Sequence, residues 1–351
     1  MRHIIFGESH GPAIGVVLEQ VPPGIKLDQE AITREMARRA PGKNDLSTSR
    51  KEADIPRILS GVFEGRTTGT PLCAVIENTD QKSKDYEKTR YLARPSHGDY
   101  TGYLRYEGFN DYRGGGHFSG RLTAPLVFAG AVAKQILEQQ NISIGAHIRQ
   151  IADVGDTPFA AEKLSAELFR KVSDKTFPTL DDNQGIFMQE RIRSAREEGD
   201  SVGGVIECAV LNVPAGVGAP DFGQNVEGIF ARHLFAVPAV KGVSFGAGFA
   251  LAIMRGSQAN DAFYMDGDQV RTKTNHSGGV NGGITNGMPI IFQVVMRPTP
   301  SISKEQDTVD MSRMENTKLT IEGRHDPCIV HRAVPVIEAA AALAVCELLG
   351  I

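Results

Sequence analysis

The sequence predicts a layered α+β fold, a β-α-β sandwich in which helices are packed between two antiparallel sheets. Several strand-like runs alternate apolar and polar residues, as strands with one covered face do. Two Ala-rich helical segments are apolar almost all round, and helices without a polar face belong in an interior. Interior helices together with one-sided strands favour a sandwich of helices between sheets over a regular βαβ alternation.

The expected strands follow from runs of Val and Ile, which pack well on a pleated surface, and from the Gly, Pro or Asn residues that bound them. They span residues 14–21, 71–78, 142–151, 202–213, 242–255 and 289–297. Their alternating pattern predicts sheets with one face toward the helices.

Three helices are expected, over about 28–40, 122–139 and 334–349. Asp28 is a good N-cap for the first helix, and Pro41 with the following glycine stops it. Glu35 and Arg39 stand at i,i+4 and are expected to pair, while Arg38 is expected to face solvent. The second and third helices lack a polar face, so we expect them in the interior.

The chain has 351 residues, of which 41% are hydrophobic and 23% are charged, as in an ordinary globular protein. No Ser- or Pro-rich linker and no repeat of fixed period divides it. We therefore expect a single domain over residues 1–351. Residues 159–198 carry more charge and a helical period, which predicts an insertion on the surface of that domain.

Composition and charge exclude several classes of function. A net charge of -4, a pI near 6.2 and 7% aromatic residues predict that the protein binds neither nucleic acid nor an anionic membrane. The four cysteines stand far apart with no Cys-x-x-Cys pair, so we expect reduced thiols and no metal. The amino terminus has no apolar signal region, and Pro335, Glu338 and Glu347 break the longest apolar stretch. These features predict a cytoplasmic protein without a membrane span.

Polar residues packed among glycines mark four segments as candidates for a site, because glycine lets a backbone approach a ligand closely. The segments are Gly7 to Gly11, Arg94 to Arg121, Asn275 to Gly283 with the strand end at 297–301, and Arg324 to Cys328. Each has a plain structural alternative, which is a glycine-rich turn, a surface loop, a glycine hairpin and a structural ion pair, respectively.

The second segment has two features that favour an anion. Gly114, Gly115 and Gly116 precede the second expected helix, where they would present amide N–H groups to an anion. Arg113, Arg121 and two histidines lie close by, and without them a plain surface loop would be the better interpretation. No Walker loop and no dinucleotide fingerprint is present.

Taken together and in this order, the segments resemble chorismate synthase over nearly the whole chain. The matching runs are Gly7-Glu8-Ser9-His10-Gly11, Arg94-Pro95-Ser96-His97-Gly98-Asp99-Tyr100, Gly114-Gly115-Gly116 with Ser119-Gly120-Arg121, Asn275-His276-Ser277-Gly278-Gly279, and Arg324-His325-Asp326-Pro327-Cys328. The resemblance implies the layered fold and a homotetramer. It also implies the reaction, an anti-1,4-elimination of phosphate from 5-enolpyruvylshikimate 3-phosphate that gives chorismate and requires reduced FMN without net redox change. The sequence leaves open whether the enzyme reduces its own flavin with NADPH or takes up reduced FMN.

The resemblance also implies roles for individual residues. His10 is expected beside the leaving phosphate as its general acid, His97 beside the flavin, and Asp326 where it assists the uptake of hydrogen. The substrate carries two carboxylates and a phosphate, which suit guanidinium forks. Its expected binding residues are Ser9, Arg39, Arg50, Arg121 and Arg324. The expected FMN-binding residues are His117, Phe118, Ser119, Pro238, Ala239, Gly282, Arg297, Pro298, Thr299, Pro300, Ser301 and Arg324.

Two positions depart from the family's pattern, and two other functions compete with the implied one. Many members have an arginine where this chain has His117 and another where it has Asp45, which bears on anion binding.

A phosphomonoesterase would also use arginines and histidines, but it needs a nucleophile or metal ligands, and no Asp/His set has metal-ligand spacing. A simple flavin reductase would share FMN but would not need so many arginines.

Overall fold

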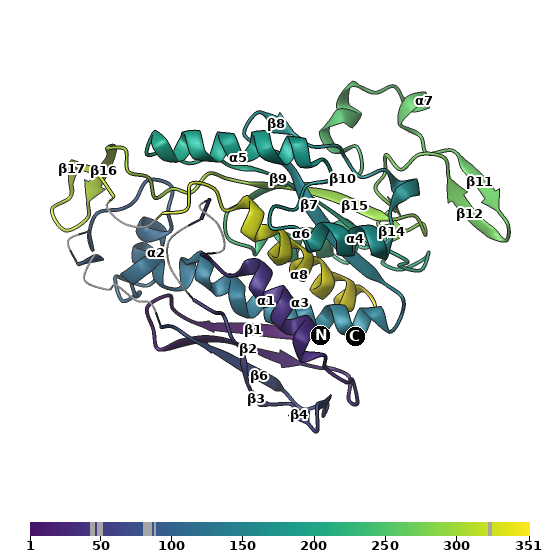
Figure 1. Cartoon of the computed structure of the whole chain (residues 1–351), viewed down its shortest axis with the longest axis horizontal. Helices are drawn as coiled ribbons and strands as arrows, with labels where there is room; N and C mark the ends of the chain where they lie inside the picture. Colours follow the sequence, from purple (N-terminus) through teal and green to yellow (C-terminus); the bar gives the residue numbers. More distant parts are fainter. Residues whose placement is uncertain (43–45, 48–51, 80–85, 88, 322–324) are drawn as a thin grey trace.

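The computed structural model describes residues 1–42, 46–47, 52–79, 86–87, 89–321 and 325–351. A layer of helices lies between a four-stranded sheet and a five-stranded sheet, both antiparallel (Figure 1). The predicted sandwich of helices between two antiparallel sheets is therefore confirmed.

The four-stranded sheet presents an apolar inner face to the helices. Its order is β1 (Arg2–Gly7), β2 (Ala13–Glu19), β6 (Leu72–Glu77) and β3 (Arg57–Ser60). Alternate residues of the central strands point inward, so Ile14 and Leu18 are fully buried. In the register Ile14 faces Ile76 and Leu18 faces Leu72, which makes the inner face continuous.

The five-stranded sheet corrects one predicted strand. Its order is β10 (Val240–Phe245), β15 (Ile290–Met296), β9 (Gly204–Leu211), β7 (Ser143–Ile151) and β8 (Val154–Gly155). The strand predicted over 242–255 is wrong beyond Phe245. Gly246 and Gly248 have positive φ values of 55° and 53°, and the chain continues as the 3-10 helix η5 (Gly248–Ile253). Left-handed backbone at these two glycines ends the extended run.

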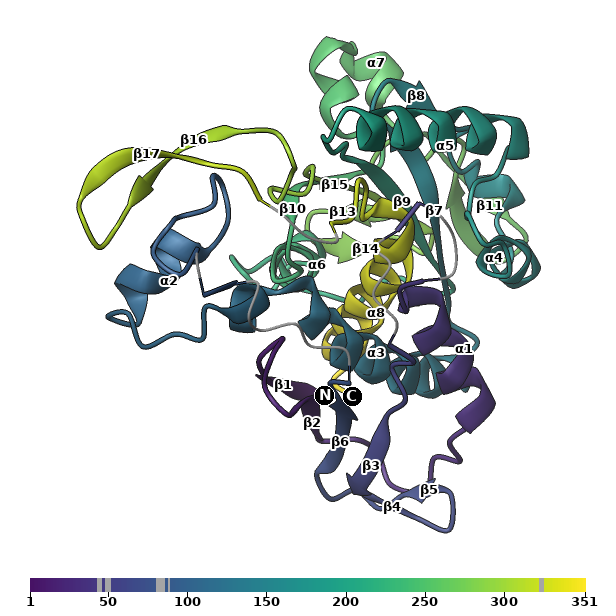
Figure 2. The ribbon, with the colours of Figure 1, turned by 60° about the vertical axis from the view of Figure 1, so that its left-hand side comes forward.

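Helices α1 (Gln29–Arg39), α3 (Thr123–Glu138) and α8 (Val330–Leu348) form the middle layer (Figures 1 and 2). The side chain of Asp28 caps α1 as predicted. As predicted, α3 and α8 are buried almost all round, and they cross so closely that a Cβ on Gly130 would stand 2.2 Å from the Cβ of Ala339. α8 begins at Val330 rather than at residue 334, and Pro335 lies inside it.

A cluster of charged side chains ties the three helices together. Glu338 of α8 is 1% exposed and accepts hydrogen bonds from Arg38 of α1 at 2.6 and 2.8 Å, from Lys134 of α3 at 2.5 Å, and from a backbone N–H of β7 at 3.1 Å. The expectation that Arg38 faces solvent is therefore wrong. Glu35 pairs with Arg38 and Lys134, not with Arg39 as expected.

The remaining elements cover the outside of this core. They are β4 (Val62–Phe63), β5 (Arg66–Thr67), α2 (Asp99–Arg105), η2 (Arg113–Phe118), η3 (Gly120–Leu122), η4 (Ala161–Lys163), α4 (Ala166–Ser173), α5 (Asp182–Glu197), α6 (Val226–Phe235), α7 (Gly256–Ala259), β11 (Phe263–Asp266), β12 (Gln269–Thr272), β13 (Val280–Asn281), β14 (Ile284–Thr285), β16 (Gln306–Asp310) and β17 (Glu315–Leu319). The β16–β17 hairpin and α2 extend together from one side of the layers (Figure 2). No helix in the described ranges is long and apolar enough to cross a membrane.

The segment predicted as an insertion, residues 159–198, contains α4 and α5. Phe159 and Phe169 pack against Leu211 and Ile291, on the face of the five-stranded sheet that points away from the helices. This packing supports the proposal that residues 1–351 form one domain with a surface insertion.

We predict that Glu338→Ala lowers the free energy of unfolding by about 3–5 kcal/mol, because it removes the fully buried anion that Arg38 and Lys134 share and leaves them only Glu35, whose side chain is 21% exposed. Burial alone would raise the pKa of Glu338, but Arg38 and Lys134 outweigh it and lower the pKa to about 2. The contribution is therefore present above pH 4.5, the value of a free Glu, and is lost as the pH falls toward 2. Urea titrations of parent and variant at pH 7 and at lower pH measure both effects.

The matched control is Glu167→Ala, which breaks the exposed Glu167–Lys171 pair on α4. This variant should change the free energy of unfolding by no more than about 0.5 kcal/mol. Equal effects of the two substitutions would contradict the structural role of the buried cluster.

Candidate active site

A cavity of about 380 Å³ opens where α1 ends and α8 begins, which is within the size range of ligand pockets. The charged residues of its described lining are five arginines and two carboxylates, namely Arg39, Arg94, Arg121, Arg297, Arg332, Glu52 and Asp326. An apolar wall faces them, formed by Val237, Pro238, Ala239, Met296, Ile329, Ala333 and Val336. The excess of guanidinium groups beside an apolar wall suits an anionic ligand with a flat, apolar part.

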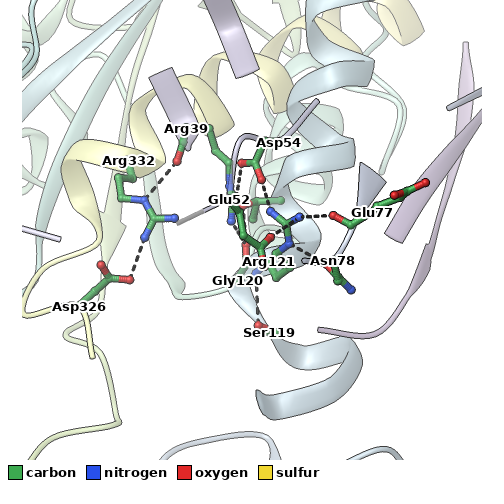
Figure 3. Close-up of polar contacts among 11 residues, drawn as sticks. Arg39, Glu52, Asp54, Glu77, Asn78, Ser119, Gly120, Arg121, Asp326 and Arg332 are labelled. Carbon is green, nitrogen blue, oxygen red and sulfur yellow. Dashed lines mark hydrogen bonds and ion pairs between the residues drawn. The ribbon is translucent and has the colours of Figure 1, made fainter. Parts of the chain in front are cut away.

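Two of the predicted arginines share one buried carboxylate (Figure 3). Arg39 donates to Asp54 at 2.6 Å, and Arg121 donates to the other oxygen of Asp54 and forms an ion pair with Glu52. Burial alone would raise the pKa of Asp54, but the neighbouring charges of Arg39 and Arg121 outweigh it and lower the pKa below its usual range. Asp54 therefore stays ionised and holds the two guanidinium groups side by side.

Backbone and neutral side-chain oxygens fix both guanidinium groups further. Arg39 donates from Nε to Thr123 Oγ1 at 3.1 Å and from Nη2 to the carbonyl of Gly120 at 3.0 Å. Arg121 donates from Nε to Asn78 Oδ1 at 3.0 Å. Both arginines are about 95% buried, so their orientation is set before any ligand arrives.

Asp326 does form an ion pair, but with a residue that the sequence did not single out. Arg332 of α8 donates from Nη1 to Asp326 Oδ2 at 2.9 Å and from Nε to the carbonyl of Arg39 at 3.2 Å (Figure 3). Arg332 thus links the C-terminal end of α1 to the segment before α8. It places the Asp326 carboxylate at the cavity wall.

His97 is held by two charged neighbours in its own segment. Its Nδ1 lies 2.7 Å from Asp99 Oδ1, and Asp99 in turn accepts from Arg94 Nε and Nη2, both at 2.7 Å. His97 lines the cavity, and its ring lies against Gly115, where a Cβ would stand 3.2 Å from Nε2. Gly115 also has a φ of 85°, a left-handed conformation that favours glycine at this close approach.

His10 and Ser9 lie behind the cavity wall. A Cβ on Gly114, which has a φ of 60°, would stand 2.1 Å from His10 Cε1 and 3.1 Å from Ser9 Oγ. The ring of His10 meets Tyr86 edge-on at 5.2 Å, and both Tyr86 and Gly114 line the cavity. His10 is thus one side chain removed from the cavity space.

The interpretation of the three glycines as amide donors at a helix N-terminus needs correction. Gly116 lies seven residues before Thr123, where α3 begins, and η3 lies between them. The N–H of Gly115 donates to the carbonyl of Tyr112 at 3.3 Å. The glycines instead allow the two histidine rings to approach the backbone, one at Gly114 and one at Gly115.

The structure brings together most of the residues predicted from sequence. The cavity lining contains His97, Asp326, Arg39, Arg121, Phe118, Ser119, Pro238, Ala239, Arg297, Thr299, Pro300 and Ser301. It does not contain Ser9, His10, His117, Gly282 or Pro298. Arg50, Arg324 and Asp45 lie outside the described residues.

Two of the absent residues occupy structural positions elsewhere. His117 is exposed and contacts the carbonyl of Gly7 through Nδ1 at 2.9 Å. Gly282 lies in the turn of the β13–β14 hairpin, with a φ of 61°, as the plain hairpin interpretation of this segment expected. Glycine suits that turn because its φ is positive.

Sequence reasoning missed several residues of the site. Glu52 and Asp54 follow no recognisable spacing, because their partners come from α1 and η3 far along the chain. Arg94 and Asp99 were signalled, since both stand in the run around His97. Arg332 had only the weak signal of a cation in an otherwise apolar helix.

A cavity lined by an excess of arginines and by an ordered histidine is typical of an enzyme site for an anionic small molecule. Comparison with known proteins identifies the family. The family model of chorismate synthase matches residues 1–349. The chorismate synthase of Thermococcus kodakarensis is 48% identical over 345 residues, which cover 98% of this chain and 94% of that protein. That of Dehalococcoides mccartyi is 45% identical over 343 residues, which cover 98% and 93%.

A solved structure agrees with these sequence relatives. A crystal structure of chorismate synthase matches with a TM-score of 0.78 at 30% identity, covering 99% of this chain and 91% of that one. The chain belongs to the chorismate synthase family, which makes it a lyase of the shikimate pathway, in aromatic amino acid biosynthesis.

We predict that Gly114→Ala lowers the free energy of unfolding by about 1–3 kcal/mol, because the new Cβ meets the His10 ring at a left-handed backbone position. The control is Gly256→Ala, where a Cβ meets nothing within 4 Å and φ is not positive. Urea denaturation of both variants measures the difference. The close contact of Gly114 with His10 is refuted if the two glycine substitutions are equally tolerated.

Proposed function

We propose that this chain catalyses the loss of phosphate from 5-enolpyruvylshikimate 3-phosphate to give chorismate, with reduced FMN required and no net redox change. The observation that carries the proposal is the arginine-rich cavity in a chain of this family. A substrate with two carboxylates and a phosphate needs several guanidinium forks in one pocket. Membership of the family supports the reaction itself.

The cavity fits a flavin on two grounds. Thr299 Oγ1 and His325 Nε2 are buried without a hydrogen-bond partner among the described residues, and both residues line the cavity. Such polar atoms are costly unless a ligand or water satisfies them. The wall formed by Val237, Pro238 and Ala239 offers an apolar surface to a ring system.

We propose that this wall, with Phe118, Ser119 and the 297–301 segment, holds FMN. When bound, reduced FMN supplies the electron-rich group that the elimination requires. Burial lowers the pKa of His325, so this residue would present a neutral imidazole, with one hydrogen-bond donor and one acceptor, to the bound FMN.

Arg39 and Arg121 are proposed to bind the substrate's anionic groups. Each already donates to Asp54, and each guanidinium group has five N–H donors, more than its recorded partners use. The carboxylate of Asp54 orients the forks and keeps two buried like charges together. Orientation of this kind reduces the entropy that binding must otherwise remove.

Three residues are proposed to take part in proton transfer. His10, behind Gly114, is the general acid for the departing phosphate, and His97 exchanges its proton with the flavin side of the cavity. Asp326, held by Arg332, assists the uptake of hydrogen. A positioned proton donor contributes about 10²–10⁴-fold in rate.

We further propose a cytoplasmic homotetramer. The exposed apolar side chains Phe249 and Ile253 on η5 and Phe263 and Met265 on β11 support contacts with neighbouring subunits. NADPH is proposed only as a reductant of the flavin.

Anaerobic incubation of the purified enzyme with reduced FMN and 5-enolpyruvylshikimate 3-phosphate tests the function. We expect equal amounts of chorismate and phosphate, and none without reduced flavin. Phosphate release without flavin would favour a phosphomonoesterase, and oxidation of the flavin without chorismate would favour a reductase. Addition of NADPH with oxidised FMN shows whether the enzyme reduces its own flavin.

We predict that Arg39→Lys weakens substrate binding by about 10–100-fold, because a lysine keeps the charge but not the fork. Arg34→Lys is the control, since Arg34 lies on the same helix with a side chain 64% exposed. Titration of each variant with substrate in the absence of reduced flavin gives the affinity, and circular dichroism reports folding. Parent-like affinity in Arg39→Lys would remove this arginine from the site.

We predict that His10→Ala and His97→Ala each lower turnover by about 10²–10⁴-fold while the enzyme stays folded and binds substrate. His3→Ala, in β1 and outside the cavity lining, is the control. Single-turnover kinetics with reduced FMN measure the chemical step. A loss of activity that only follows the loss of folded protein would show that the two histidines are structural.

A further inference from the structure

We propose that Asp99 is a positioning residue that holds His97 in the tautomer with a proton on Nδ1, so that every proton His97 exchanges passes through Nε2. The proposal rests on the proposed role of His97 as the proton-exchanging group beside the flavin. It concerns how the fold prepares that ring, which can be measured in the enzyme without any ligand.

The contacts of Nδ1 decide the tautomer. Asp99 Oδ1 lies 2.7 Å from Nδ1, and Arg94 Nη2 lies 3.1 Å from the same nitrogen. If Nδ1 were the acceptor, its lone pair would point at a carboxylate oxygen across 2.7 Å, which is repulsive. If Nδ1 carries the proton, it donates a charge-assisted hydrogen bond to Asp99. The shorter contact therefore assigns the proton to Nδ1.

Arg94 does not need Nδ1 as an acceptor, because Asp99 satisfies it. Arg94 donates to Asp99 from Nε and Nη2, both at 2.7 Å, and from its backbone N–H at 3.1 Å. Burial alone would raise the pKa of Asp99, but hydrogen bonds from Arg94 and His97 outweigh it and lower the pKa well below its usual range. The carboxylate that faces Nδ1 is therefore ionised at neutral pH.

The position of Asp99 is fixed by the fold as well as by Arg94. Asp99 is the first residue of α2, and the His97 N–H donates to the carbonyl of Arg94 at 3.1 Å, which closes a tight turn around the pair. Arg94 Nη1 also reaches Ser301 Oγ at 3.4 Å. The unit of Arg94, His97 and Asp99 is thus joined to the 297–301 segment proposed to bind FMN.

Nε2 is the ring nitrogen left for chemistry. It makes no hydrogen bond to any residue in the described part of the chain, and it lies beside Gly115 at the cavity wall. With Nδ1 protonated in both charge states of the ring, only the proton on Nε2 can come and go.

Other charged groups around the cavity do not compete for Nδ1. From the end of β15, Arg297 donates to the carbonyl of Ser96, beside His97. The remaining titratable and charged residues of the described lining are Arg39, Glu52, Tyr86, Arg121, His325, Asp326 and Arg332. None of these donates to or accepts from the His97 ring, so among the described residues Asp99 and Arg94 are the groups in contact with Nδ1.

The first test is solid-state 15N NMR of the full-length, ligand-free enzyme labelled at histidine, with His97→Gln used to assign the His97 signals. At a pH where the ring is neutral, we expect Nδ1 to be protonated and Nε2 to be unprotonated. A parent His97 found with its proton on Nε2 overturns the proposal, whatever the variants do.

The second test is Asp99→Asn, in which the amide oxygen takes the place of the Asp99 oxygen bound by Arg94 Nε and the backbone N–H. The amide NH2 then faces Nδ1 and donates to it, so we expect the proton to move to Nε2. Turnover should fall by about 10²–10⁴-fold, the contribution of a correctly placed proton donor, while substrate affinity is unchanged.

The matched control is Asp153→Asn, which weakens a surface carboxylate–arginine pair in which Arg191 also donates from Nε and Nη2, at 2.7 and 3.1 Å, to the two oxygens of Asp153. This variant should change neither the His97 signals nor turnover. Asp99→Asn with parent signals and parent turnover would reduce Asp99 to a structural residue.

The two proposals fail separately. If His97→Gln turns over as fast as the parent while the NMR shows the Nδ1–H tautomer, the role of His97 is wrong and its positioning is right. If Asp99→Asn does not fold, the tautomer of the parent enzyme still decides the question.

Discussion

Helix α8 has almost no polar face, and the structure must therefore cover it on every side. The five-stranded sheet lies against one side, and α3, α1 and α6 lie against the others, with Gly130 of α3 allowing close contact at Ala339. The one acidic side chain buried in the middle of this helix, Glu338, finds two cations and a backbone N–H from three other elements. Pairing with these two cations allows the ionised carboxylate of Glu338 to remain in the core.

The candidate active site lies at the N-terminal end of α8, where this covering stops. The N-terminal end of α8 lies beside the C-terminal end of α1. There Arg332 of α8 donates both to Asp326 and to the carbonyl of Arg39. Hydrogen bonds within the protein fix the orientation of two arginines of the cavity. Arg39 and Arg121 share Asp54, so an arriving anion meets forks whose orientation the protein has already fixed.

Two histidines approach this cavity through the same run of glycines. Gly114 accommodates His10 and Gly115 accommodates His97, and both glycines have positive φ. This glycine run thus leaves room for the His97 ring in the cavity wall and for the His10 ring just behind that wall. The pair formed by Arg94 and Asp99 adds a fixed direction to the His97 ring.

The sequence determined the class of fold because periodicity is local: a helix that is apolar all round must be buried, and a half-covered strand must have an inner face. It also marked the segments around His10, His97, Arg121 and Asp326, since their residue types stand together in the chain. Only the tertiary structure decided the partners. Arg38 turns inward because Glu338, 300 residues away in the chain, lies beneath it.

Contacts between distant segments also set local backbone. The run from 242 stops being a strand where Gly246 turns against the backbone of His276, an approach that no pattern within the run could reveal. Likewise Asp54 binds Arg39 and Arg121 because packing brings α1 and η3 together, not because of any spacing in the sequence. Local physics selects the elements, whereas distances between side chains depend on how the elements pack.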